Sequence, residues 1–136
     1  MTREEKRLRS MEITKYFLGC VAYTGSHSVH LYESMKDEVN TLYILDHIKL
    51  SHRDLFFPTK DPYENEETDV IVVPGRKFDR QLNRQGRGRG YYDRFLAKSS
   101  AIKVGICFES QLMNNLDPKK HDIPMDMIIT EKGIIQ

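Results

Sequence analysis

Glycine and arginine alternate in one short stretch of the chain, and this stretch carries its strongest chemical signal. Its members are Arg84, Gly86, Arg87, Gly88, Arg89 and Gly90. Glycine lets backbone N–H groups approach an anion closely, and arginine offers fork-shaped donors that suit phosphate oxygens. A predicted helix begins directly after Gly90, so its N-terminus adds a positive partial charge. The pattern predicts a polyphosphate-binding loop, although it is neither a Walker A sequence nor a dinucleotide GxGxxG sequence.

Two other interpretations of this loop stay open from the pattern alone. One is a solvated basic loop, because residues 76–94 hold six arginines and one lysine against two aspartates in a chain of net charge +1. The other is an RGG-like RNA contact. RGG segments are usually repeated and disordered, whereas this stretch occurs once, between a predicted strand and a predicted helix. This difference from RGG segments favours phosphate binding over an RNA contact.

A carboxylate follows the glycines at Asp93. Magnesium is typically held by one or two carboxylates together with phosphate oxygens, so Asp93 is a candidate metal ligand. An acid in the first turn also stabilises a helix N-terminus, and spacing alone does not choose between these roles. The five histidines and two cysteines show no spacing typical of a metal site, and no Ser/His/Asp or Cys/His constellation is evident. Cys107 lies in an apolar stretch and is expected to be a core residue.

The elements that must position these residues alternate along the chain. Residues 69–74 are apolar on both faces, which is typical of a buried parallel strand. Apolar spacing and flanking turn residues predict the remaining elements. We expect helices at 2–17, 41–48 and 91–98, and further strands at 27–32, 54–57, 102–108 and 127–129. Such alternation indicates an α/β fold with a mostly parallel sheet. In such a fold the ligand loops follow the strands, and the two polar loops of this kind are residues 33–41 and 75–90.

Composition limits the class of protein. A chain of 136 residues with 39% hydrophobic residues supports one domain, residues 1–136, with one compact core. The near-neutral charge gives no whole-chain case for nucleic-acid or membrane-surface binding. No apolar run reaches about 18 residues, and the charged N-terminus lacks an apolar signal region. Together with two widely separated cysteines, these features predict a cytoplasmic protein.

Three blocks of sequence resemble one known family. Residues 72–79, followed by residues 83–94, are similar to the 5-formyltetrahydrofolate cyclo-ligases, also called methenyltetrahydrofolate synthetases. That family shows a strand ending in Pro-Gly, then Phe-Asp, then a glycine-rich run ending in Tyr-Tyr-Asp. Residues 33–41 and 123–130 match two further blocks. The resemblance implies a three-layer α/β/α sandwich, Rossmann-like, as in the group of cyclo-ligases, ribose-5-phosphate isomerases and CoA-transferases.

The same resemblance implies a reaction. The family converts 5-formyltetrahydrofolate, with or without a polyglutamate tail, to 5,10-methenyltetrahydrofolate, using ATP and Mg²⁺ and releasing ADP and phosphate. ATP phosphorylates the formyl oxygen, N10 attacks the activated carbon, and phosphate leaves. This chemistry needs charge neutralisation and positioning more than a protein nucleophile, so no catalytic nucleophile or base is assigned. A monomer is expected, with no nucleic-acid or membrane partner.

The resemblance also assigns site residues by position. ATP is expected to contact Arg84, Gly86, Arg87, Gly88, Arg89, Gly90, Tyr91, Tyr92, Lys6 and Arg9. Folate is expected to contact Glu33, Glu38, Arg87 and Tyr91. Magnesium is expected to bind Asp93 and Asp126. For Glu38 the reason is chemical, because a carboxylate can accept two parallel N–H bonds from a 2-amino-pyrimidinone edge.

Two departures from the family bear on activity. Only residues 59–68 join the predicted strands that end near Pro58 and begin at Asp69, so the segment that helps to cover folate in the family is missing. The family's N-terminal helix carries a lysine one turn before an arginine, and here the lysine position falls on Glu5, with Lys6 beside it. The alternatives are therefore a catalytically impaired relative that binds nucleotide or folate, and an RNA-binding module.

Overall fold

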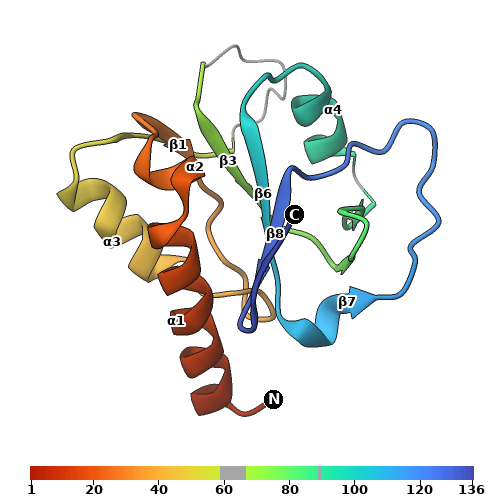
Figure 1. Cartoon of the computed structure of the whole chain (residues 1–136), viewed down its shortest axis with the longest axis horizontal. Helices are drawn as coiled ribbons and strands as arrows, with labels where there is room; N and C mark the ends of the chain where they lie inside the picture. The colour runs from red at the N-terminus through yellow and green to blue at the C-terminus, as the bar shows by residue number, and fades with distance from the viewer. Residues whose placement is uncertain (59–66, 89) are drawn as a thin grey trace.

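The computed structural model describes residues 1–58, 67–88 and 90–136. Its central sheet has the strand order β2-β1-β3-β6-β8-β9, and all neighbours are parallel except the last pair (Figure 1). The strands are β1 (Ser28–His30), β2 (Asp54–Phe56), β3 (Val70–Val73), β6 (Ile102–Ile106), β8 (Met127–Thr130) and β9 (Gly133–Ile135). The mostly parallel sheet confirms the predicted α/β class.

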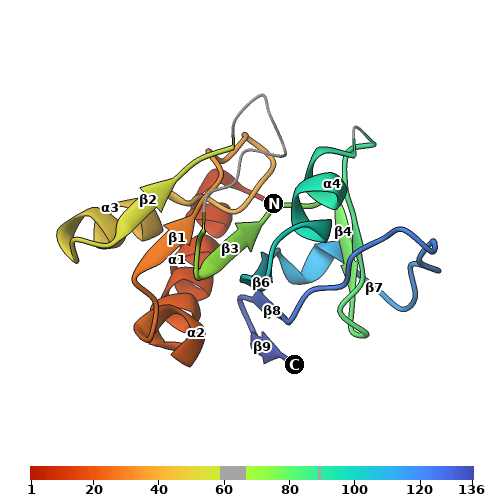
Figure 2. The ribbon, with the colours of Figure 1, turned by 90° about the horizontal axis from the view of Figure 1, so that it is seen from above.

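Helices cover both faces of this sheet. Figure 2 shows α1 (Arg3–Gly19), α2 (Val21–Thr24) and α3 (Leu42–Leu50) on one side and α4 (Tyr91–Ala97) on the other. The pleat of β3 explains the arrangement, because successive side chains of a strand point to opposite faces. Val70 and Val72 join the core beneath α1 and α3, whereas Ile71 joins the core beneath α4. Burial on both faces is what the continuous apolar run predicted, and the result is three layers.

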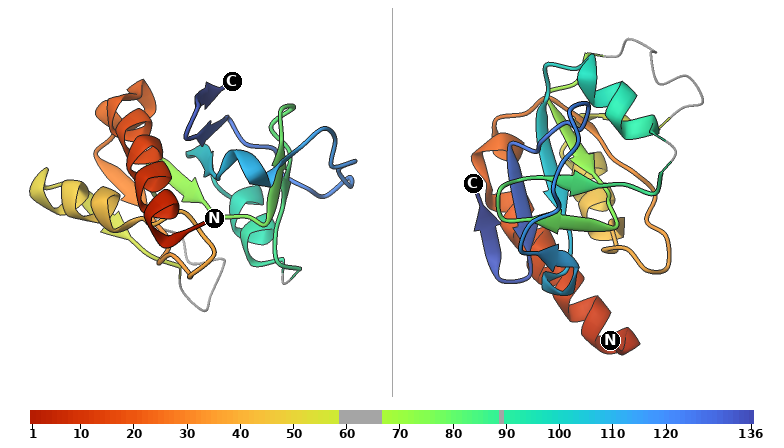
Figure 3. Two further views of the ribbon diagram at one scale, coloured as in Figure 1. Left: turned by 90° about the horizontal axis from the view of Figure 1, so that it is seen from below. Right: turned by 90° about the vertical axis from the view of Figure 1, so that its right-hand side faces the viewer.

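A second, smaller sheet has the order β5-β4-β7 and packs on the α4 side (Figure 3). It contains β4 (Lys77–Asp79), β5 (Arg84–Gln85) and β7 (Leu112–Met113), and a 3₁₀ helix, η1 (Glu109–Gln111), precedes β7. Prediction of a plain loop over residues 75–90 was therefore wrong. Strands of two or three residues are too short to show a period, and their pairing depends on the distant β7. Phe78 anchors this sheet, because a Cβ at Gly105 would lie 2.6 Å from its ring.

Smaller differences concern ends and connections. Helix α2 and strand β9 lie in stretches for which no element was expected, and strand β1 is shorter than the predicted strand. Cys107 is fully buried, as predicted, and burial raises the pKa of its thiol. The connection at residues 59–68, between the predicted strands that end near Pro58 and begin at Asp69, falls largely outside the described residues. Among the described helices, none is long and apolar enough to cross a membrane.

Candidate functional site

A cavity of about 1280 Å³ opens beyond the carboxyl ends of β1, β2 and β3, on the α4 side. Its lining comes from segments far apart in sequence. They are the β1–α3 loop (residues 32–38), residues 57–58 after β2, residues 74–75 after β3, the basic stretch 84–94, and residues 116–122, which we call the wall segment. The two polar loops predicted to carry function therefore face one space. The wall segment is a lining element for which the sequence offered no signal.

Arg84 is the most deeply placed cation of this lining, with a side chain that is only 6% exposed. Its Nε donates to the carbonyl oxygen of Pro74 at 2.6 Å, and its guanidinium lies 5.2 Å from the centre of the Tyr92 ring. Its Nη1 lies 3.6 Å from Asp93 Oδ1. Burial lowers the pKa of Arg84, and the Asp93 charge opposes this shift. The guanidinium is thus held rigidly at the cavity, with part of its donor set still able to meet an anion.

Glycine is required in the basic stretch for two different physical reasons. Gly90 adopts a φ of 70° as the residue before α4, a conformation that other residues rarely adopt. A Cβ at Gly86 would lie 2.7 Å from Nη2 of Arg84, so only glycine leaves that guanidinium its place. Gly86, Gly88 and Gly90 all line the cavity, as predicted for a loop that brings backbone close to a ligand. Arg89, also predicted to contact ATP, lies outside the described residues.

Glu38 supplies a buried carboxylate to the cavity from the β1–α3 loop. It is 7% exposed, and its Oε1 accepts a hydrogen bond of 2.8 Å from the backbone N–H of Met35. Its Oε2 lies 3.8 Å from Nη2 of Arg87, and the same nitrogen donates to both carboxylate oxygens of Asp37 at 3.0 Å. Arg87 thereby joins the basic stretch to the β1–α3 loop, and it lowers the pKa of Asp37. Glu33 lines the same cavity from an exposed position.

Two tyrosines of α4 also belong to the lining. Tyr91 and Tyr92 both line the cavity, with ring centres 5.1 Å apart. The Tyr92 hydroxyl is buried and has no hydrogen-bond partner among the described residues, and burial raises its pKa. A buried hydroxyl without a partner is costly, so this oxygen is well suited to a hydrogen bond with a ligand.

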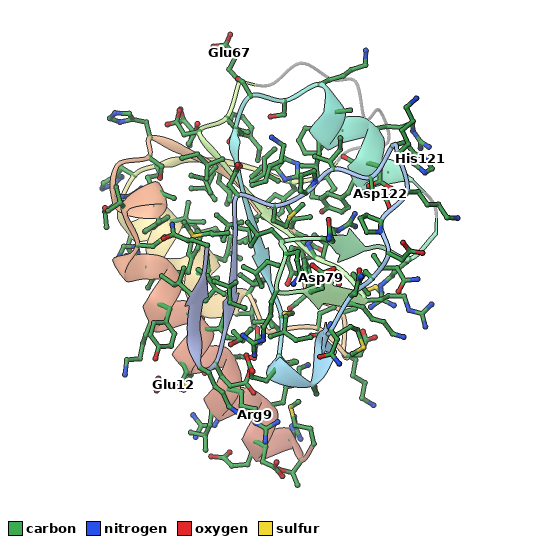
Figure 4. The ribbon with its side chains drawn as sticks, turned by 45° about the vertical axis from the view of Figure 1, so that its right-hand side comes forward. Arg9, Glu12, Glu67, Asp79, His121 and Asp122 are labelled. Carbon is green, nitrogen blue, oxygen red and sulfur yellow. The ribbon has the colours of Figure 1, made fainter. Side chains whose placement is uncertain are left out.

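The two predicted magnesium ligands are not brought together. Asp93 lines the cavity, but Asp126 is not part of the lining. Because Asp126 directly precedes β8, it lies at the amino end of that strand. There its Oδ2 accepts a hydrogen bond of 2.7 Å from the backbone N–H of Lys103. Asp122, four residues earlier, lines the cavity with a side chain that is 24% exposed (Figure 4). Its charge acts on Arg84 together with that of Asp93, so Asp122 is the carboxylate that sequence reasoning missed.

Lys6 and Arg9, predicted to reach ATP, are not part of the cavity lining. Lys6 Nζ donates to the backbone carbonyl of Lys36 on the β1–α3 loop. Arg9 donates to Glu5 at 3.2 Å and lies 3.7 Å from Glu131, and Figure 4 shows it on α1, well away from Asp122. In this structure both cations are therefore bound to protein groups outside the cavity, since the turns of α1 direct them toward the β1–α3 loop and the β8–β9 turn.

Comparison with known proteins agrees with this geometry. The model of the 5-formyltetrahydrofolate cyclo-ligase family matches residues 60–131. A probable 5-formyltetrahydrofolate cyclo-ligase of Schizosaccharomyces pombe is 33% identical over 87 residues, which cover 53% of this chain and 43% of that protein. The chain thus aligns with less than half the length of that relative. The 5-formyltetrahydrofolate cyclo-ligase of Mus musculus is 23% identical, with 96% of this chain and 86% of that protein covered.

Solved structures give the same result. The NMR structure of Aquifex aeolicus 5,10-methenyltetrahydrofolate synthetase superposes with a TM-score of 0.85 and 28% identity, covering 100% of this chain and 84% of that one. Ribose 5-phosphate isomerase from Plasmodium falciparum shares the fold alone, with a TM-score of 0.50 and 17% identity over 81% of this chain and 54% of that chain. The family model spans more than half of the chain and includes the basic stretch, α4 and the wall segment. The chain therefore belongs to the 5-formyltetrahydrofolate cyclo-ligase family.

Proposed function

We propose that this protein catalyses the ATP- and Mg²⁺-dependent cyclisation of 5-formyltetrahydrofolate to 5,10-methenyltetrahydrofolate. The observation that carries the proposal is a single cavity lined by a buried arginine, a glycine-rich stretch and a buried glutamate. The reaction requires a phosphate donor and a folate to meet, and groups suited to each of them line this one cavity. Membership of the family supplies the reaction itself.

The phosphate end of the cavity is the side formed by the basic stretch and α4. Arg84 is fixed by Pro74 and offers its remaining N–H groups, while Gly86, Gly88 and Gly90 keep backbone close to the cavity. Fixed donors in a partly dry site stabilise developing negative charge better than water does, because they need no reorganisation. We assign these residues to the ATP phosphates and to the phosphoryl group in transfer.

We assign magnesium to Asp93 and Asp122, the two cavity carboxylates whose charges act on Arg84. Asp93 and Asp122 are each partly exposed, so they can bind a hydrated ion while phosphate oxygens complete its shell. A group of three or more protein ligands is the pattern of a closed metal cage, and the described residues contain no such group. Mg²⁺ on a nucleotide needs only one or two carboxylates, because phosphate oxygens and water supply its other ligands. When bound, the ion would neutralise part of the phosphate charge. Arg84 holds Asp93 in place for that role.

Glu38 is assigned to the pterin ring. Its Oε1 bond to Met35 fixes the carboxylate, and each carboxylate oxygen can accept more than one hydrogen bond. Two parallel N–H donors of a 2-amino-pyrimidinone match such a carboxylate. Tyr91 and Arg87 border the same space, so the formyl group would lie between Glu38 and the phosphate side.

Turnover by the unmodified chain tests the proposal. We expect formation of the methenyl product, followed by its near-ultraviolet absorbance, only when ATP, Mg²⁺ and 5-formyltetrahydrofolate are all present. Nucleotide binding without turnover would instead identify the impaired relative. An RNA affinity that falls steeply with salt, with no turnover and no effect of ATP, would support the RNA-binding alternative.

Replacing Asp122 tests the metal assignment. We expect Asp122→Asn to raise the Mg²⁺ concentration for half-maximal turnover by at least about tenfold, because even outer-shell partners of a metal cost that much when removed. Asp126→Asn is the matched control, since this carboxylate faces the Lys103 N–H outside the cavity. A magnesium titration of both variants and of the unmodified chain gives the answer. Equal shifts in the two variants, or a shift only in Asp126→Asn, would contradict the assignment.

We also infer that residues 1–136 form one domain, because the central sheet unites strands from Ser28 to Ile135. The monomeric state and the cytoplasmic location stay predictions from the sequence.

A further inference from the structure

Asp79 is a fully buried carboxylate that does not line the cavity. It lies at the end of β4, where its Oδ1 accepts from the backbone N–H groups of Gln81 at 3.0 Å and Asn83 at 2.9 Å. Its Oδ2 accepts from Asn83 Nδ2 at 3.0 Å and from the backbone N–H of Leu116 at 3.0 Å. Burial alone would raise its pKa, but these hydrogen bonds outweigh burial and lower it. The group is thus a buried anion with four donors.

Three of these four bonds close the turn between β4 and β5. That turn ends at Asn83, and the next residue is Arg84, whose guanidinium enters the cavity. The backbone N–H of Asp79 also donates to the carbonyl of Asn83 at 3.1 Å. The direction in which the chain enters β5, and with it the place of Arg84, therefore depends on Asp79.

The fourth bond reaches a different part of the chain. Leu116 is the first residue of the wall segment, and this bond holds its backbone. The same turn holds the far side of that segment, because the carbonyl of Leu82 accepts from the N–H of Met125 at 2.8 Å. One turn thus anchors the chain on both sides of Asp122. Figure 4 shows Asp79 in the small sheet, below Asp122 and His121 on the connection to β8.

We propose that Asp79 is a positioning residue that couples the arginine of the phosphate site to the carboxylate of the metal site. It touches neither ligand, and it acts through Arg84 on one side and through the wall segment on the other. This inference rests on the proposed function for the roles of those two residues. A buried acid that merely stabilised the small sheet would need only its local turn, and the bond to Leu116 is the part that such a role does not require.

Two substitutions separate the local bonds from the bond to the wall segment. Asp79→Asn keeps an oxygen for Gln81 and Asn83 but turns an amide N–H₂ toward Asn83 Nδ2 and Leu116 N–H. Adding Asn83→Asp restores the side-chain pair by exchanging donor and acceptor, yet leaves the Leu116 N–H without its acceptor. Asn83→Ala removes the local side-chain bond and keeps the bond to Leu116. The exchanged pair also supplies a folded variant if Asp79→Asn alone is too unstable.

The measurements are denaturant unfolding, hydrogen exchange of the Leu116 amide without nucleotide, and the Mg²⁺ dependence of ATP binding. We expect the exchanged pair to recover most of the stability lost in Asp79→Asn. It should still exchange Leu116 at least about tenfold faster than the unmodified chain, and it should need about tenfold more Mg²⁺ for half-saturation. Asn83→Ala should lose stability but keep the exchange rate of Leu116 and the Mg²⁺ requirement of the unmodified chain.

Unchanged Mg²⁺ dependence in the exchanged pair would overturn the coupling. Unchanged exchange at Leu116 in both Asp79 variants would overturn the anchoring of the wall segment. Failure of the proposed function is recognised separately, by the absence of turnover in the unmodified chain. The metal half of the coupling falls only if the unmodified chain also binds no ATP with Mg²⁺, and the exchange measurement decides the anchoring in either case.

Discussion

Replacing Arg84 with methionine should lower kcat/KM for ATP by about 100- to 1000-fold, the loss expected when a fixed donor to developing charge is removed. Arg84 is almost fully buried and is held by the Pro74 carbonyl, so water cannot replace it and no neighbouring side chain has its position. Methionine keeps the length of the side chain and suits the apolar surroundings near Tyr92. Asp93, which would lose its cation, is partly exposed and can be solvated. Steady-state kinetics over ATP concentration measure the effect.

Two controls sharpen this experiment. Arg84→Lys keeps the charge but loses the fork, so it should recover only part of the activity. Arg80→Met removes an arginine that lies four residues before Arg84 and outside the cavity lining. Arg80 is 60% exposed and pairs with Glu109, so its loss should leave ATP use within about twofold of the unmodified chain, as is usual at exposed ion pairs. Equal losses in Arg80→Met and Arg84→Met would mean that the stretch acts only through its total charge.

Glu38→Gln should raise the KM for 5-formyltetrahydrofolate by about 10- to 100-fold while ATP binding changes little. Hydrogen bonds to a charged group contribute about 1.5–3 kcal/mol, and each 1.4 kcal/mol is a factor of ten in affinity. Glutamine has one oxygen in place of two, and Met35 N–H already uses an oxygen of this group. The remaining amide N–H₂ would face the N–H donors of the pterin. Folate titrations at saturating ATP measure the change.

Asp37→Asn is the matched control for Glu38. It removes the same charge from the adjacent residue, but the Asp37 side chain is 68% exposed and its contact is to Arg87. We expect a change in folate KM of no more than about fivefold, because exposed ion pairs contribute about 1 kcal/mol or less. If Asp37→Asn weakens folate as much as Glu38→Gln does, the pterin is not bound by Glu38 and the folate end of the cavity must be reassigned.

The local sequence accounts for much of the site because much of the site is local. The strand at 70–73, the basic stretch and α4 all lie between residues 70 and 97, so residue types alone predict a strand, an anion loop and a helix N-terminus. Glu38 and Tyr92 could be assigned by their resemblance to the family, and both line the cavity. Such features depend on side-chain chemistry and short spacing, which a sequence displays directly.

The features that the sequence did not place depend on contacts between distant parts of the chain. Asp122 and Asp126 are both acids ahead of the same strand, and only the parallel pairing of β8 with β6 shows that Asp126 ends at the amino edge, against Lys103. The small sheet was missed because Lys77–Asp79 pairs with Leu112–Met113, more than thirty positions away. Lys6 was assigned to ATP only because it is next to Glu5, the position at which the family has its lysine. Its contact with the Lys36 carbonyl joins residues thirty positions apart and is not visible in the local sequence.

The sequence alone indicates an α/β protein of the cyclo-ligase type and predicts a phosphate-binding stretch before α4, since alternating elements and a contiguous motif are properties of neighbouring residues. Which carboxylates share the cavity, what forms its wall and what holds that wall were decided only by tertiary structure. Asp79 is the clearest case, because its four hydrogen bonds connect residues 79–83 with residue 116. A buried anion selects its donors by their positions in space, and separation along the chain does not reveal those positions.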